Sequence, residues 1–304
     1  MNVKDFAKFY NSILVDGYID KDVDALYHYT SPAGFSSIIE KNRLRFTDRF
    51  YLNDKSEGIF VLKQCVDNID YFGFLSDGFK KSFLKKCKER MIQPQRDRFF
   101  VYQCSFSMDK DSLCLWNYYT KSDGIKGYNL KFDANNLAEC ISVSPKDKKR
   151  APKLIYGKVI YNKEDQLKIL YEIIKQFYDY SQRDTVSGND FITAYLIDKI
   201  MQIGVFFKMP CFSIEKEYRL AYDLYLEENN TYAVIKDEQH FYEKNGIFVP
   251  YVDLGFKQEY LIGVGISPTL DFEATKESIL RITGAKYSNV KSETIYKSEI
   301  PVRY

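Results

Sequence analysis

The sequence predicts an α+β fold with a mixed or split β-sheet core, flanking helices and a helical insertion. Short segments rich in β-branched and aromatic residues, which are typical of strands, recur along the 304-residue chain. These segments do not alternate regularly with helices, and this disfavours a doubly wound parallel sheet. A helical period dominates only between about residues 163 and 204, where it predicts the insertion.

The composition predicts a single domain spanning residues 1–304. Hydrophobic residues make up 45% of the chain, which is ample material for a core. The 44 basic and 42 acidic residues nearly cancel. No global field therefore draws the protein to nucleic acid or to an anionic membrane, and any such contact must be a local patch.

The cysteines and the N-terminal residues predict a cytoplasmic protein without a membrane partner. The six cysteines form no C-x-x-C motif and have no histidines at ligand spacing, so we expect neither a metal site nor a disulfide framework. The first residues lack the apolar core of a signal peptide, and no run of about 18 apolar residues occurs.

The first third of the chain is predicted to begin with a helix over residues 2–15 and to contain a short strand from Leu44 to Phe46. Farther along, Asn53 or Asp54, followed by Glu57, resembles a capping box that opens a helix over residues 59–69. Capping alone is enough to explain these polar residues.

The rest of the chain predicts mostly strands. They cover residues 99–106, 125–132, 154–161, 214–225, 231–236, 247–254, 260–266 and 288–296. One short helix carries Leu113, Trp116 and Tyr119, and another covers residues 271–283. Two long helices form the insertion, with a polar loop at residues 181–189 between them.

His28 lies where a predicted strand meets a predicted helix. Residues Ala25 to Thr30 predict the strand, Ser31 is a favourable N-cap, and Pro32 suits the first helical position. The free N–H groups of a helix N-terminus beside a strand end suit a phosphate or pyrophosphate. The alternative is a histidine that only forms a hydrogen bond within a half-buried strand.

A second candidate feature is the strand that contains Glu215, Glu217 and Arg219. In an extended chain these three side chains lie on one face. One glutamate can then stabilise a developing positive charge or orient a hydroxyl group, while the guanidinium keeps its neighbour ionised. An ordinary charge ladder on an exposed strand explains the same spacing.

The order of several short motifs resembles a widespread bacterial family of unknown function. The motifs are Tyr27-His28-Tyr29-Thr30, Leu52-Asn53-Asp54-x-x-Glu57, Cys104-Ser105-Phe106-Ser107 with Leu113-x-x-Trp116-x-x-Tyr119, Phe207-Lys208 with Phe212-x-x-Glu215-x-Glu217-Tyr218-Arg219, and Ser298-x-Ile300-Pro301-x-Arg303. Together they span almost the whole chain.

The layout of these motifs also resembles that of ADP-ribosyltransferases of the His-Tyr-Glu type. This resemblance implies NAD as the substrate and a sheet core of that type. It implies that His28, Tyr29 and Thr30 bind NAD, that Glu217 is the catalytic glutamate, and that Glu215 positions the acceptor. It further implies that Asn53, Glu57, Trp116, Lys208 and Arg219 line the site, and that Tyr119 or Tyr51 stacks on nicotinamide.

Three functions remain open at this point. The first is an NAD-dependent ADP-ribosyltransferase that modifies a protein or nucleic acid, as a toxin or anti-phage effector. The second is a non-catalytic binding module with a buried polar network. The third is a metal-dependent nuclease that uses Asp54, Glu57 and Glu217. A dinucleotide fold of the Rossmann type is not expected, because Gly263-x-Gly265 lacks the third glycine of the fingerprint.

Overall fold

The computed structural model describes residues 3–52, 56, 58–92, 99–120, 124–135, 137, 153–183, 188–225 and 239–302. The chain divides into two compact units. We call the first the helical unit (Met1–Asp20, Arg49–Phe99 and Val159–Phe212) and the second the sheet unit (Lys21–Asp48, Phe100–Lys158 and Ser213–Tyr304).

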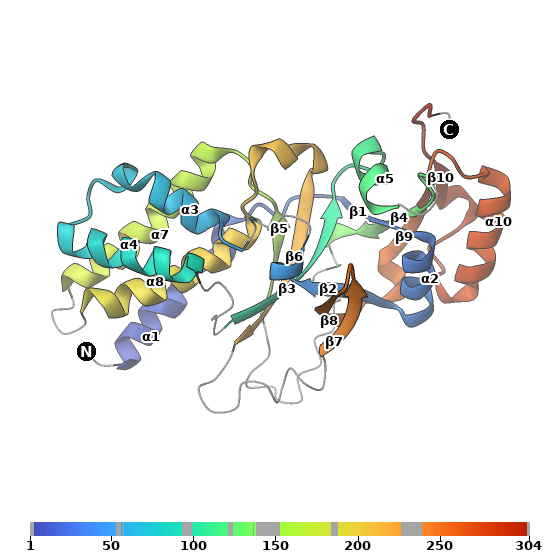
Figure 1. The fold of residues 1–304 in the computed structure, drawn as a ribbon. Coiled ribbons are helices and arrows are strands. Elements are labelled where there is room, and N and C mark those ends of the chain that lie inside the picture. The colour runs from blue at the N-terminus through green and yellow to red at the C-terminus, as the bar shows by residue number, and fades with distance from the viewer. Residues whose placement is uncertain are drawn as a thin grey trace. The chain divides into compact units, whose positions relative to one another are not determined.

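Helices pack against one another in the helical unit (Figure 1). They are α1 (Val3–Ser12), α3 (Phe60–Asp67), α4 (Asp77–Ile92), α7 (Lys163–Arg183) and α8 (Asn189–Ile203). The ring of Phe6 in α1 lies 5.0 Å from that of Phe191 and 4.9 Å from that of Tyr195, both in α8. Helix α4 corresponds to no element predicted from the sequence.

The two helices predicted for residues 163–204 are α7 and α8. The apolar side chains of α7 recur at helical spacing and are buried, among them Leu167, Leu170 and Ile174. The side chain of Asn162 caps this helix, since its Oδ1 accepts hydrogen bonds from the N–H groups of Glu164 and Asp165 at 2.8 and 3.2 Å.

The sheet unit contains a mixed, open sheet of ten strands (Figure 1). The strands are β1 (Ala25–Thr30), β2 (Arg43–Asp48), β3 (Phe99–Ser107), β4 (Tyr128–Asp133), β5 (Lys153–Lys158), β6 (Glu217–Tyr225), β7 (Gln239–Lys244), β8 (Ile247–Gly255), β9 (Leu261–Ile266) and β10 (Ile295–Lys297). Their order is β10-β9-β4-β1-β3-β2-β8-β7, and β6 pairs with both β3 and β5. Strands β9 and β10 are parallel, whereas β4 pairs antiparallel with β1 and with β9. The α+β class and the mixed sheet are therefore confirmed.

The sheet branches at β3. This strand pairs with β1 at one position, Ser107 opposite Tyr27, and with β2 at Gln103 and Tyr102. It also pairs with β6. A strand has only two hydrogen-bonding edges, so two of these three neighbours share one edge at different positions along β3.

Alternation of side chains along the strands separates two faces of the sheet. One face carries the main apolar core, which includes Leu26, Phe106, Leu130 and Tyr218. Helices α2 (Pro32–Lys41) and α10 (Phe272–Thr283) contribute apolar side chains to this core. On the opposite face, helix α5 (Leu113–Tyr119) packs over β1.

Local signals placed several boundaries correctly. Ser31 is the N-cap of α2, as predicted, and its Oγ accepts a hydrogen bond from the N–H of Gly34 at 3.1 Å. Asp271 caps α10 in the same way. The prediction that Asn53 or Asp54 caps the next helix is wrong, because α3 begins only at Phe60 with Ile59 as its N-cap.

Two predicted strands are not reproduced as predicted, one because it is shorter and one because its residues are not described. The closing strand is limited to Ile295–Lys297, and the predicted strand at 231–236 lies outside the described residues. None of the described helices has both the length and the apolar character needed to span a membrane.

Replacement of Ser31 by alanine should lower the free energy of unfolding by about 1 kcal/mol, because the N–H of Gly34 loses its capping acceptor. Denaturant unfolding measures this loss. Ser292→Ala, at an exposed position, serves as the control. Equal stabilities of the two variants would contradict the assigned cap.

Candidate functional site

The structure describes most of the residues that the sequence singled out, and places most of those in the sheet unit. The sheet unit contains His28, Tyr29, Thr30, Trp116, Tyr119, Glu215, Glu217 and Arg219. Lys208 belongs to the helical unit, where it is buried with its Nζ 4.8 Å from the centroid of the Phe212 ring. Asn53 and Glu57, with Asp54, lie outside the described residues, as does Arg303 of the last motif.

Glu217 and Arg219 form a buried ion pair at the start of β6. Nε and one terminal nitrogen of Arg219 each donate to a different carboxylate oxygen of Glu217, both at 2.8 Å. The exposed fraction is 4% for Glu217 and 1% for Arg219. Two parallel charge-assisted hydrogen bonds fix the orientation of the carboxylate.

Glu215 does not share the strand with this pair. The prediction that Glu215, Glu217 and Arg219 lie on one face of an extended segment is wrong, because Pro210–Glu215 is a 3-10 turn. Lys216, which follows the turn, has a positive φ of 43°. Contacts with Ser107, at the end of β3, and with the two residues after it hold this conformation.

Three of these contacts are described around the turn. Ser107 Oγ donates to the carbonyl oxygen of Glu215 at 2.7 Å, and the N–H of Met108 donates to the carbonyl oxygen of Lys216 at 2.9 Å. Lys216 Nζ also lies 3.1 Å from Oδ2 of Asp109. Because these contacts hold Glu215 and Lys216 in a non-extended conformation, strand β6 begins only at Glu217.

His28 lies on the core face of β1, opposite Leu130 of β4 and with its ring centroid 5.4 Å from that of Phe106. Its Nδ1 is 3.0 Å from the carbonyl oxygen of Ser105. A carbonyl oxygen can only accept, so Nδ1 carries the proton and Nε2 of the neutral ring retains a lone pair. Burial lowers the pKa of His28 below its usual 6.5, although the bond to Ser105 opposes this shift.

Glu217 and Arg219 lie on the other face of the sheet, because the side chains between and beyond them, Tyr218 and Leu220, belong to the main core. The structure therefore places the side chains of His28 and Glu217 on opposite faces of the branched sheet. The strands that carry them, β1 and β6, both pair with β3, but the two side chains do not line a common surface.

Tyr29 and Trp116 are braced within a polar network. Their ring centroids are 4.7 Å apart in an edge-to-face arrangement, and Trp116 has no exposed surface. Trp116 Nε1 donates to Asp111 Oδ1 at 2.8 Å, and the hydroxyl of Tyr29 donates to the carbonyl oxygen of Asp109 at 2.8 Å. Burial raises the pKa of Tyr29. The two rings therefore fasten α5 to β1.

Two further predicted residues have different surroundings. Tyr119, at the end of α5, is 38% exposed and presents part of its ring to solvent. Thr30 is half-buried beneath the first turn of α2, where a side chain on Gly34 would collide with its Oγ1. Thr30 thus helps to set the angle between β1 and α2.

Tyr27 is a further candidate site residue, to which the sequence motifs gave no role. It is half-buried, and it lies on the same face as Ser107, its partner in the ladder. Burial, with a smaller contribution from the charge of Asp109, raises the pKa of Tyr27. The sequence did contain a signal for this placement. Tyr27 and Tyr29 are two residues apart in a strand, and Leu26 before them is apolar, so the two tyrosines are expected on the face opposite Leu26. We use the term polar face for the surface with Tyr27, Ser105, Ser107, Glu217 and Arg219.

The segment from α5 to the Glu217–Arg219 pair also matches the model of a protein family. Residues 115–220 match the family described as a protein of unknown function, DUF2971. No curated protein and no solved structure matches the chain. The match supports the expected resemblance to a family of unknown function, and the DUF2971 segment includes Trp116, Tyr119, Glu215, Glu217 and Arg219.

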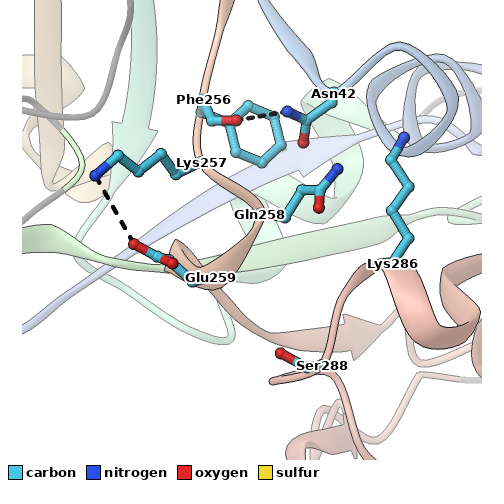
Figure 2. Close-up of a pocket in the computed structure, with 7 residues that line it drawn as sticks. All are labelled: Asn42, Phe256, Lys257, Gln258, Glu259, Lys286 and Ser288. Carbon is cyan, nitrogen blue, oxygen red and sulfur yellow. Dashed lines mark hydrogen bonds and ion pairs between the residues drawn. The ribbon is translucent and has the colours of Figure 1, made fainter.

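An open pocket of about 470 Å³ lies elsewhere in the sheet unit (Figure 2). It is lined by Asn42, Phe256, Lys257, Gln258, Glu259, Lys286 and Ser288. Asn42, which has a φ of 55°, donates through Nδ2 to the carbonyl oxygen of Phe256. Lys286 Nζ donates to the carbonyl oxygens of Ile39 and Glu40 at 2.9 and 3.0 Å. None of the predicted site residues lines this pocket.

Within the described part of the chain, no group of three or more His, Cys, Asp and Glu side chains is placed to hold a metal ion.

The lowered pKa of His28 predicts a pH-dependent stability. The unfolded chain takes up a proton near pH 6.5, whereas the folded chain does so only at lower pH. The contribution of neutral His28 is therefore complete above pH 6.5 and is lost as the pH falls below that value. We expect the melting temperature of wild type to fall more steeply than that of His28→Gln in this range. Parallel profiles for wild type and His28→Gln would contradict the prediction.

Removal of one member of the buried ion pair should be strongly destabilising. Glu217→Ala leaves the guanidinium of Arg219 buried without this carboxylate and should cost about 3 to 5 kcal/mol in denaturant unfolding. The double variant Glu217→Leu/Arg219→Met should lose less than the sum of its two single variants. Additive losses would show that the two charges do not stabilise each other.

Proposed function

We propose that the protein is an NAD-dependent ADP-ribosyltransferase-like enzyme that modifies a macromolecule, and that Glu217 is its catalytic carboxylate. The observation that carries the proposal is the fixed carboxylate of Glu217 on the polar face, with both oxygens bonded to Arg219. The motif resemblance supplies the reaction class. As a cellular role we propose a toxin or anti-phage effector.

The proposed chemistry uses this carboxylate to stabilise a transient positive charge. When the bond between nicotinamide and ribose breaks, nicotinamide takes the bonding electrons and leaves as a neutral molecule. The ribose becomes oxocarbenium-like and is attacked by a nucleophile of the acceptor, which then gives up its proton. A fixed anion favours this transition state over the ground state, because the charge on the ribose is largest there.

The other residues of the motifs have narrower roles in this proposal. In this proposal NAD binds on the polar face, so His28, whose side chain lies on the core face, does not touch it and instead fixes β1 beside β3 through its bond to the carbonyl oxygen of Ser105. Tyr29 and Trp116 hold α5 against β1 on the polar face, and Thr30 supports the first turn of α2. Tyr27 or Tyr119 offers an aromatic surface for nicotinamide.

A non-catalytic binding module is the second candidate. The observation that favours it is the burial of both Glu217 and Arg219, which gives them an architectural role that requires no reaction. In that case Glu217 matters for folding alone.

Nicotinamide release from NAD, with and without cell lysate, tests the proposal. Glu217→Gln keeps the shape of the side chain and should lower the rate roughly 10²- to 10⁴-fold, as expected for loss of one positioned electrostatic group. Glu293→Gln, at an exposed position, is the control and should react like wild type.

Each outcome of this experiment assigns a role to Glu217. A folded Glu217→Gln variant with the wild-type rate would remove Glu217 from the chemistry. A wild-type protein that releases no nicotinamide in either condition would contradict the enzyme and leave the binding module.

A further inference from the structure

We propose that the polar face continues over strands β2, β8 and β7 as a binding surface for single-stranded nucleic acid, centred on Arg45. We call this the arginine–tyrosine surface and define it by Arg43, Arg45, His240, Tyr242 and Tyr251. The inference deepens the proposed function, because it names the acceptor class, and only the acceptor role rests on that function.

The strand registers place these side chains on one face. Arg45 of β2 lies opposite Asp253 of β8, and Tyr251 of β8 lies opposite His240 of β7. Tyr242 is two residues after His240 on the same strand and shares its face. The intervening residues of β2 and β8, such as Phe46 and Val252, point into the main core.

Arg45 packs against two neighbouring aromatic rings. Its guanidinium carbon lies over the rings of Tyr251 and Tyr242, 4.1 and 4.8 Å from their centroids, and its Nε is 4.0 Å from a carboxylate oxygen of Asp253. The side chain nevertheless remains 42% exposed. These contacts immobilise a planar cation before any ligand arrives, so less conformational freedom is lost on binding.

The charge of the surface suits a polyanion. Arg43 is exposed on the same face, about 7 Å from Arg45 along β2, given two residues of an extended strand. Lys244 is also exposed there, two residues after Tyr242, and Asp253 is the acidic residue among them. The whole chain, with 44 basic and 42 acidic residues, is nearly neutral, so attraction of a polyanion requires a local basic patch such as this one.

The combination of planar and charged groups favours a single strand over a duplex. Unpaired bases can stack on aromatic rings and on a guanidinium plane, and the phosphates can bind the outer N–H groups of arginine. The ring of His240, with its centroid 5.5 Å from that of Tyr251, adds a further flat group beside them.

The surface leads toward the candidate catalytic carboxylate. Thr47 follows Arg45 on this face of β2 and lies opposite Gln103 of β3. Ser105 and Ser107 continue the same face along β3, and β6 with Glu217 pairs with that strand. A strand bound across β7, β8 and β2 would therefore reach the proposed site of ADP-ribose transfer.

Fluorescence anisotropy with a short labelled single-stranded RNA, and with its DNA counterpart, tests the surface in the absence of NAD. Arg45→Ala and the double variant Tyr242→Ala/Tyr251→Ala should each weaken binding roughly 5- to 100-fold, as expected for lost stacking. Arg45→Ala should also reduce the dependence of log K on log salt by about one charge. Arg281→Ala, an exposed arginine of α10, is the matched control and should bind like wild type.

The controls keep this result separate from the NAD assay. All variants are compared only where their melting temperatures match wild type, and Arg45→Lys, which keeps the charge without the plane, should recover only part of the affinity. Absence of wild-type binding at low salt, or equal losses for Arg45→Ala and Arg281→Ala, would overturn the inference. So would transfer of ADP-ribose to protein with no binding of either oligonucleotide. Binding without nicotinamide release would support the surface and reject the enzyme.

Discussion

The two edges of strand β3 have to serve three neighbouring strands, and the organisation of the sheet unit follows from this constraint. Every buried N–H and C=O group needs a partner, so a branched sheet must supply substitutes wherever a ladder stops. The pairing of β1 with β3 is described at one position, Tyr27 with Ser107, and next to it the imidazole of His28 satisfies the carbonyl of Ser105. Ser107 Oγ performs a similar task for the carbonyl of Glu215.

This arrangement also explains why charged groups occur so deep in the fold. Alternation along β6 sends Tyr218 and Leu220 into the apolar core and leaves Glu217 and Arg219 on the opposite face. Both are nevertheless almost fully covered, and the two hydrogen bonds of their ion pair offset part of the loss of hydration. A site built on this pair is rigid, which suits an electrostatic role more than one that needs a mobile base.

Local chemistry was sufficient to predict the elements whose ends depend on their own side chains. Ser31 and Pro32 indicated the start of α2, and the apolar period of residues 167–177 indicated α7. The spacing of Glu217 and Arg219 likewise placed them on one face, and the structure joins them directly.

The features that sequence reasoning missed depend on distant residues. Nothing near Lys216 in the sequence requires its positive φ, which is held by Met108 and Asp109 of another segment. The face to which His28 points was equally hidden, because it follows from its register with Leu130. The sequence around Arg45 is that of an ordinary exposed strand, and its two aromatic partners, Tyr242 and Tyr251, come from distant strands.

The hydrogen bonds at the end of α2 have a consequence for biosynthesis. Asn42 bonds to Phe256, 214 residues away, and Lys286 bonds to Ile39 across 247 residues. Contacts of such long sequence separation require closure of very large loops and therefore slow folding. The core beneath α2 cannot close on the ribosome until the segment after residue 256 has emerged. During that interval the apolar side of β1 and β2 lacks part of its cover, and transiently exposed apolar surface of this kind is prone to aggregation.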